Sequence, residues 1–165
     1  MAELTNLETK LGEVIGLAMA AQDATKKVGK LVEDEGDDDL VATLQTMAEE
    51  AAQAEQRGAE LAGRFEGKKT AILDEARTVK KKASEMMSTY LDADADALDG
   101  FEFLTMAEAS EVGHWSVLGK LGERAGQLDV RQLVEWQLPI QQRHLRDTME
   151  GSLRLAAEED PNAVS

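Results

Sequence analysis

Several residue types are missing or rare in the sequence: among 165 residues it has no cysteine, two prolines and six aromatic residues. Without cysteine the chain has no disulfide framework, no thiolate nucleophile and no thiolate metal site. Scarce aromatics predict a core of Ala, Leu, Val and Met, and scarce proline favours helices. No apolar run approaches the length of a membrane span, and no signal-peptide pattern opens the sequence. We therefore expect a cytoplasmic protein without a membrane partner.

Basic residues are also few. Eighteen Lys and Arg stand against 33 Asp and Glu, which gives a formal net charge of −15. A nucleic-acid binder needs a basic face to neutralise phosphates, so the balance argues against nucleic acid as a partner. The one local exception is the segment 68–82, which contains six of the eighteen basic residues.

Apolar residues recur at helical spacing, and no strand-like alternation interrupts them. Gly36 suits a helix C-terminal cap, Asp129 suits an N-terminal cap, and Pro139 should bend the last helix. We expect one domain over residues 1–158 and a disordered tail over 159–165. The apolar repeats predict five helices, over Leu4–Glu33, Leu40–Phe65, Ile72–Tyr90, Phe101–Ala125 and from Asp129 to about Ala157.

The lengths of the connections predict a topology. The first two helices are joined tightly, as are the last two, so each pair should form an antiparallel hairpin. About thirty-five residues, including the weaker middle helix, separate the hairpins. This organisation predicts an all-α, ferritin-like four-helix bundle with an extra crossover helix between its second and third core helices.

The loop before the fourth predicted helix, 91–100, is rich in aspartate. Asp92, Asp94 and Asp96 alternate as they do at the start of a calcium loop. However, Ala97 and Phe103 stand where such a loop needs Gly and Glu. An acidic loop that caps the next helix is the interpretation we favour.

Polar residues occupy core positions in the fourth helix. Glu111 and His114 replace apolar residues on its inward face, and Glu108 lies beside them. The repeat that identifies this face is Leu104, Ala107, Glu111, His114, Leu118 and Leu121. A buried carboxylate is costly unless it is paired, hydrogen-bonded or metal-bound, so these residues need partners from other helices.

Candidate partners come from three other helices. In the last helix Gln141 lies at the centre of the inward face, with Gln137 and His144 one turn to either side. Glu50 borders the face of the second helix, and Gln22 lies on the flank of the first. Converging carboxylates and imidazoles predict either a metal site or a hydrogen-bonded network that fixes the register of the helices.

The same segments resemble a known family. "AEASEVGHWSVLGKLGERAGQ" resembles the third core helix of the YciE/YciF-type ferritin-like stress proteins, and "LVEWQLPIQQRHL" resembles their final helix. "AAQD" is similar to part of their first helix, the second predicted helix to their His-x-x-Glu-Thr segment, and the Lys-rich segment after Phe65 to their crossover. The likeness extends over nearly the whole chain in pattern, although the residue matches are sparse.

The resemblance implies a dinuclear iron or manganese site, and the chain departs from that pattern. Glu111 matches a family carboxylate, whereas Gln22 and Gln141 stand where the family has Glu. His114 and Trp115 replace a small residue and a Tyr. Glutamine is neutral and does not bridge two cations as a carboxylate does, so we do not expect a full di-iron site.

Three functions remain open. The first is a dimeric ferritin-like bundle of the stress-response type, structural or metal-handling. The second is a metalloprotein with one iron, manganese or zinc ion on Glu50, Glu111, His114 and His144, supported by Gln22, Glu108, Gln137 and Gln141. The third is a bundle that binds a flat ligand such as flavin or tetrapyrrole between Trp115 and Trp136. Whether the protein is an enzyme is undecided on the sequence alone.

Overall fold

A computed structural model describes residues 2–164, and within that span the chain is all-α, without a strand. None of the helices in this span is long and apolar enough to cross a membrane. The predicted helices are confirmed, with shifted ends. They are α1 (Asn6–Glu35), α2 (Asp38–Ala62), α3 (Lys69–Tyr90), α4 (Ala97–Ala125) and α5 (Leu128–Ala156).

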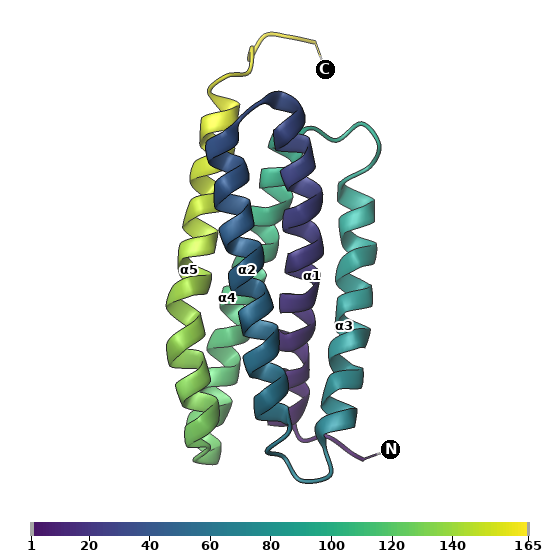
Figure 1. The fold of residues 1–165 in the computed structure, drawn as a ribbon, viewed down its shortest axis with the longest axis vertical. Helices are drawn as coiled ribbons and strands as arrows, with labels where there is room; N and C mark the ends of the chain where they lie inside the picture. Colours follow the sequence, from purple (N-terminus) through teal and green to yellow (C-terminus); the bar gives the residue numbers. More distant parts are fainter. Residues whose placement is uncertain (1, 165) are drawn as a thin grey trace.

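The helices lie side by side in one elongated bundle (Figure 1). Helices α1 and α2 form one antiparallel hairpin and α4 and α5 another, as predicted. The hairpins meet through contacts of α1 with α4 and of α2 with α5. Helix α3 connects the hairpins and packs mainly on α1, at the edge of the bundle. Helices α1 and α5 run in one direction, and α2 and α4 run in the other.

Side-chain and glycine caps explain where the helices begin and end. Gly36 ends α1 in the left-handed conformation, with φ 81°, as the sequence predicts. Asp96 caps α4 through a capping box with Asp99, which confirms an acidic capping loop. The expectation that the loop extends to residue 100 is wrong, because this box starts the helix at Ala97. Asp129 is not the cap of α5: it lies within the first turn, after Gln127.

Helix α5 continues through Pro139. Because proline has no backbone N–H, one hydrogen bond of the helix is not made there. It ends at Ala156, one residue before the predicted end. Residues 157–164 contain turns rather than helix. Ser165, the last residue of the predicted tail, lies outside the described residues.

The core consists of two apolar clusters. One surrounds Trp115 and Leu118, towards the end of the bundle where α2 ends, and the other surrounds Phe101 and Leu104 at the opposite end. Between them along the helices lies a set of polar side chains that we call the polar layer. Its members are Glu50, Glu108, Glu111, Gln137, Gln141 and His144.

Helix α3 is covered along only part of its length. Ile72 and Ala76, near its beginning, are fully buried, whereas Met86 and Tyr90 are more than half exposed. The predicted apolar face of this helix is therefore only half buried. Gly12 and Gly16 allow the first half of α3 to approach α1 closely. A Cβ on Gly16 would lie 2.3 Å from the carbonyl oxygen of Ala76.

We expect Gly16→Ala to lower the free energy of unfolding by about 1–3 kcal/mol, because the new methyl group would push α3 away from α1. Gly29→Ala is the matched control in the same helix, since a Cβ there meets nothing within 4 Å. It should raise stability by about 0.5–1 kcal/mol through helix propensity. Urea unfolding of the two variants measures both changes. Equal stability of the two variants would contradict the packing described for Gly16.

Candidate functional site

His144 lies at the centre of the polar layer, between two carboxylates from different helices. Its Nε2 is 3.2 Å from Oε1 of Glu50 on α2, and its Nδ1 is 3.6 Å from Oε2 of Glu108 on α4. The His144 and Glu108 side chains are 3% and 2% exposed, so water screens their attraction little. The ring therefore links three helices by charge.

Further side chains from α5 complete this contact. The amide of Gln141 donates to Glu108, and Arg143 donates to Glu50. Gln137 Nε2 donates to Gln141 Oε1 at 3.1 Å, while its own Oε1 is buried without a partner among the described residues. Glu50 and Glu108 therefore each have a side-chain donor, Arg143 and Gln141 respectively, and both share the imidazole of His144.

The surroundings favour the protonated form of His144. Burial by itself would lower the pKa of the imidazole, but hydrogen bonds and charge from Glu108 and then Glu50 outweigh it. The pKa consequently lies above the ordinary value of 6.5. With both nitrogens facing carboxylates, the ring acts as a double donor.

Glu111 differs from the other members of the polar layer. It is 4% exposed, and among the described residues its carboxyl group has no hydrogen-bond or ion-pair partner. Desolvation, and then repulsion by Glu108, raise its pKa well above the ordinary value of 4.5. An acidic group is thus buried without the compensation that Glu50 and Glu108 receive.

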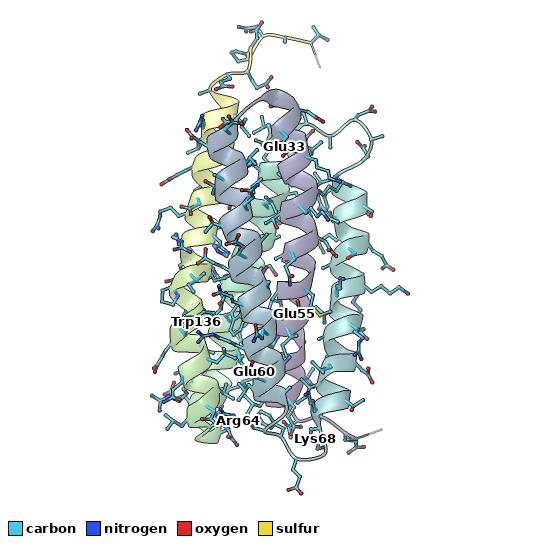
Figure 2. All side chains as sticks on the ribbon, viewed as in Figure 1. Glu33, Glu55, Glu60, Arg64, Lys68 and Trp136 are labelled. Carbon is cyan, nitrogen blue, oxygen red and sulfur yellow. The ribbon has the colours of Figure 1, made fainter. Side chains whose placement is uncertain are left out.

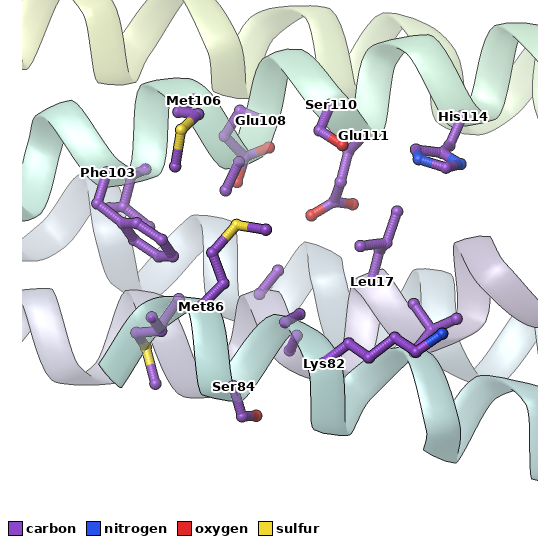
Figure 3. A pocket seen from close by; sticks show the side chains of 18 residues that line it. Leu17, Lys82, Ser84, Met86, Phe103, Met106, Glu108, Ser110, Glu111 and His114 are labelled. Atoms are coloured by element: carbon purple, nitrogen blue, oxygen red, sulfur yellow. The ribbon is translucent and has the colours of Figure 1, made fainter. Parts of the chain in front are cut away.

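The carboxyl group of Glu111 points into a cleft between α1, α3 and α4, as Figure 3 shows. The cleft has a volume of about 400 Å³ and mostly apolar walls. Leu17 and three alanines of α1 form one wall, and the uncovered half of α3, with Met86, forms another. We call this space the α1/α3/α4 cleft. Volume and lining both match those of small-molecule sites in proteins.

His114 is not a core residue, contrary to the prediction. Its side chain is 35% exposed and lies at the border of α4 with α1. Its Nδ1 is 3.2 Å from Nζ of Lys10 and 3.2 Å from Oε2 of Glu13. The buried face of α4 contains Glu108 and Trp115 where the expected repeat has Ala107 and His114, a shift of one residue at both positions. The two histidines therefore belong to separate groups.

Gln22 also lies apart from the polar layer. Its amide donates to Oε2 of Glu55 on α2, at 2.5 Å, and to the carbonyl oxygen of Ala18, at 3.2 Å. Figure 2 labels Glu55 on this side of α2. The sequence predicts that Gln22 supports the metal site, but among the described residues it contacts none of the predicted ligands.

The two tryptophans do not enclose a common space at the cleft. Trp115 is fully buried in an apolar cluster, with its Nε1 lacking a partner among the described residues, and it does not line the α1/α3/α4 cleft. Trp136 lies on α5 (Figure 2), with the guanidinium of Arg57 3.7 Å from its ring centroid. A flat ligand on Trp136 would have to displace that cation.

The donor set does not fit the dinuclear centre that the resemblance implies. Both nitrogens of His144 are directed at carboxylates, Arg143 neutralises Glu50, and Gln141 supplies an amide where a bridging carboxylate is needed. Among residues 2–164 no three His, Asp or Glu side chains are grouped as a metal site. Of the four predicted ligands, only Glu50 and His144 are brought into contact.

Sequence reasoning missed the partners that decide these pairings. Arg143 adjoins His144 in the chain, and its charge was the available signal for the pairing with Glu50. Glu13, which pairs with His114, borders the apolar face of α1 in the sequence. Nothing in the sequence pattern indicated that Glu111 would face a cleft, because that depends on where α3 separates from α4.

We expect His144→Gln to lower the free energy of unfolding by about 3 kcal/mol, because it leaves Glu108 buried with its cation removed. His114→Gln is the matched control, and its half-exposed pair should change stability by less than about 1 kcal/mol. Thermal and urea unfolding measure both. Similar losses in the two variants would contradict a central role for His144.

The effect of His144→Gln should also depend on pH in a defined direction. Since the folded-state pKa is raised, the stabilisation by His144 is complete below about pH 6.5 and is lost as the pH rises through the raised pKa. The stability difference between wild type and variant should therefore be larger at about pH 6 than at about pH 9. A difference that grows with pH would contradict a charged imidazole.

Metal loading tests the remaining metalloprotein hypothesis. After incubation with ferrous, manganous or zinc ions and desalting, we expect less than about a tenth of an equivalent of bound metal, since the donors are already paired. Elemental analysis of protein purified without chelator provides the measurement. A stoichiometric amount that His144→Gln abolishes would restore the single-metal hypothesis.

Comparison with known protein families finds no match for this chain, and neither curated proteins nor solved structures give one. The resemblance to the YciE/YciF-type proteins therefore stays a prediction.

Proposed function

We propose that this protein is a ligand-binding helical bundle, with the α1/α3/α4 cleft as its binding site. The observation that carries the proposal is the carboxyl group of Glu111, which is buried, lacks a protein partner and points into the cleft. Burial removes the carboxyl group from most of its water and raises its pKa. A ligand that supplies a hydrogen-bond or charge partner would stabilise the charged form.

The walls of the cleft suit the apolar part of a small molecule. Ala20, Ala21 and Ala24 keep the α1 side shallow, and Met86, Met87 and Met106 contribute flexible thioether side chains from α3 and α4. Methionine adapts its shape to different partners and is common at binding surfaces that accept varied ligands. Met86 and Met106 are also 52% and 40% exposed, which a bound hydrocarbon would reduce.

The architecture we propose beneath this site is a ferritin-like four-helix bundle of α1, α2, α4 and α5, with α3 as the crossover helix. The directions of the four helices and the long connection between the hairpins support it. Under this proposal the polar layer occupies the level of the ancestral metal site but serves as a structural network. The cleft arises where α3 was added outside the bundle.

A titration with neutral alcohols tests the binding function. We expect hexanol and octanol to bind saturably, with affinity rising up to about fourfold for each added CH₂, the equivalent of about 0.8 kcal/mol of buried apolar surface. Amide NMR should place the largest shifts at residues 17–24, 79–87 and 103–114. Shifts that do not saturate, or that lie elsewhere, would contradict the proposal.

A variant that fills the cleft provides the control. Ala83→Phe, on the half-buried side of α3, should weaken octanol binding by about tenfold or more, since the ring takes up the space of the ligand. Ala52→Phe makes the same change at an exposed position of α2 and should leave the affinity unaltered. Equal affinities for the two variants would place the alcohol outside the cleft.

A further inference from the structure

The charges of the polar layer do not balance. Its three carboxylates are Glu50, Glu108 and Glu111, and the two cations beside them are Arg143 and His144. Both cations contact Glu50, and His144 also faces Glu108. Neither reaches Glu111 among the described residues. Glu111 is therefore left without a positive partner, and its carboxyl group points into the α1/α3/α4 cleft, which Glu108 also lines.

The other charged groups around the cleft do not fill this role. On α4, His114 is engaged with Glu13 and Lys10 of α1, at 3.2 Å from each. On α3, Lys82 is exposed and extends along the cleft in Figure 3, and no ion pair joins it to Glu111. Lys82 therefore forms no ion pair with Glu111 in the free protein, but a bound cation and Lys82 would compete for the same carboxylate.

We infer that the α1/α3/α4 cleft binds the ammonium form of an aliphatic or aromatic amine, with Glu111 as its counter-ion. This inference rests on the proposed ligand-binding function and specifies the class of ligand. The ammonium group would lie against the Glu111 carboxylate, and the hydrocarbon part would lie between Leu17 of α1 and Met86 of α3. Ser110 lines the same part of the cleft and offers a hydroxyl group as a second acceptor.

Other ligand classes fit the same observations less well. An anionic amphiphile would bring its charge towards Glu111 and Glu108, in a chain with a net charge of −15. A hard divalent cation needs several oxygen ligands, whereas most of the lining is apolar and the nearby carboxylate of Glu108 is already paired with Gln141 and His144. A primary ammonium needs only one carboxylate and a few acceptors, and it brings its own apolar surface.

The test compares three ligands of the same length, octylamine, octanol and octanoate, by calorimetry near neutral pH in moderate salt. Wild type should bind octylamine about tenfold or more tightly than octanol, and octanoate most weakly, since hydrogen bonds to charged groups are the stronger ones. Glu111→Gln should abolish the preference for the amine and keep octanol binding. Lys82→Gln should strengthen binding of octylamine alone.

Glu102→Gln is the matched control for general attraction of amines to an acidic surface, because Glu102 is exposed on the same helix. It should leave the tenfold preference intact. If octanol binds and octylamine binds no better, or if Glu111→Gln retains the preference, the amine inference is wrong and the proposed function stands. If none of the three ligands binds, both are wrong.

A measurement on the wild-type chain keeps the inference testable even if Glu111→Gln does not fold. Carbon NMR of the Glu111 carboxyl group follows its ionisation directly. Saturation with octylamine should lower the pKa of Glu111 from its raised value, because the ammonium stabilises the charged form. Octanol should not lower it. An unchanged ionisation midpoint in the presence of bound octylamine would overturn the inference.

Discussion

The ring of His144 lies between the carboxylates of Glu50 and Glu108, joins the two hairpins at the polar layer and favours one register between them. Helices α2 and α5 pack less extensively with each other than the helices within either hairpin. The contact of His144 with Glu50 therefore adds a charged interaction where the apolar packing is limited. An apolar layer at this level would tolerate sliding by one helical turn. A buried charge requires its partner at a fixed height, because breaking the pair leaves the other charge unsolvated.

Helix α4, which carries Glu108, also carries Glu111, an acidic residue outside the contacts of His144. Glu108 and Glu111 are three positions apart, so their side chains diverge by roughly 60° around α4. That angle is enough to direct Glu108 towards α5 and Glu111 towards α1 and α3. Both residues line the α1/α3/α4 cleft, but only Glu108 is paired with side chains of α5. Glu111, which the sequence pattern places among candidate metal ligands, is through this angle the polar group of the proposed binding site.

The helices and the inward position of Gln141 and His144 follow from periodicity, and the hairpins follow from the lengths of the connections; both are local properties of the chain. Two features could not follow from them. On α4 the repeats through His114 and through Trp115 share Leu104, Glu111 and Leu118, so apolar spacing alone does not choose between them, and packing against α5 selects the second. On α3 the apolar face continues to Tyr90, but whether another helix covers it depends on the tertiary arrangement.

The presence of Gln141 rather than a carboxylate in the polar layer has an electrostatic consequence for Glu111 and the cleft. With Glu at this position the polar layer would contain four carboxylates beside Arg143 and His144, an excess of two negative charges that suits divalent metal. With Gln the excess is one, and it resides on Glu111. A single proton is enough to neutralise this charge, and a single ammonium would do the same in a complex. The charge that remains therefore matches a monovalent organic cation better than a metal pair, and the apolar walls beside Glu111 favour the same ligand.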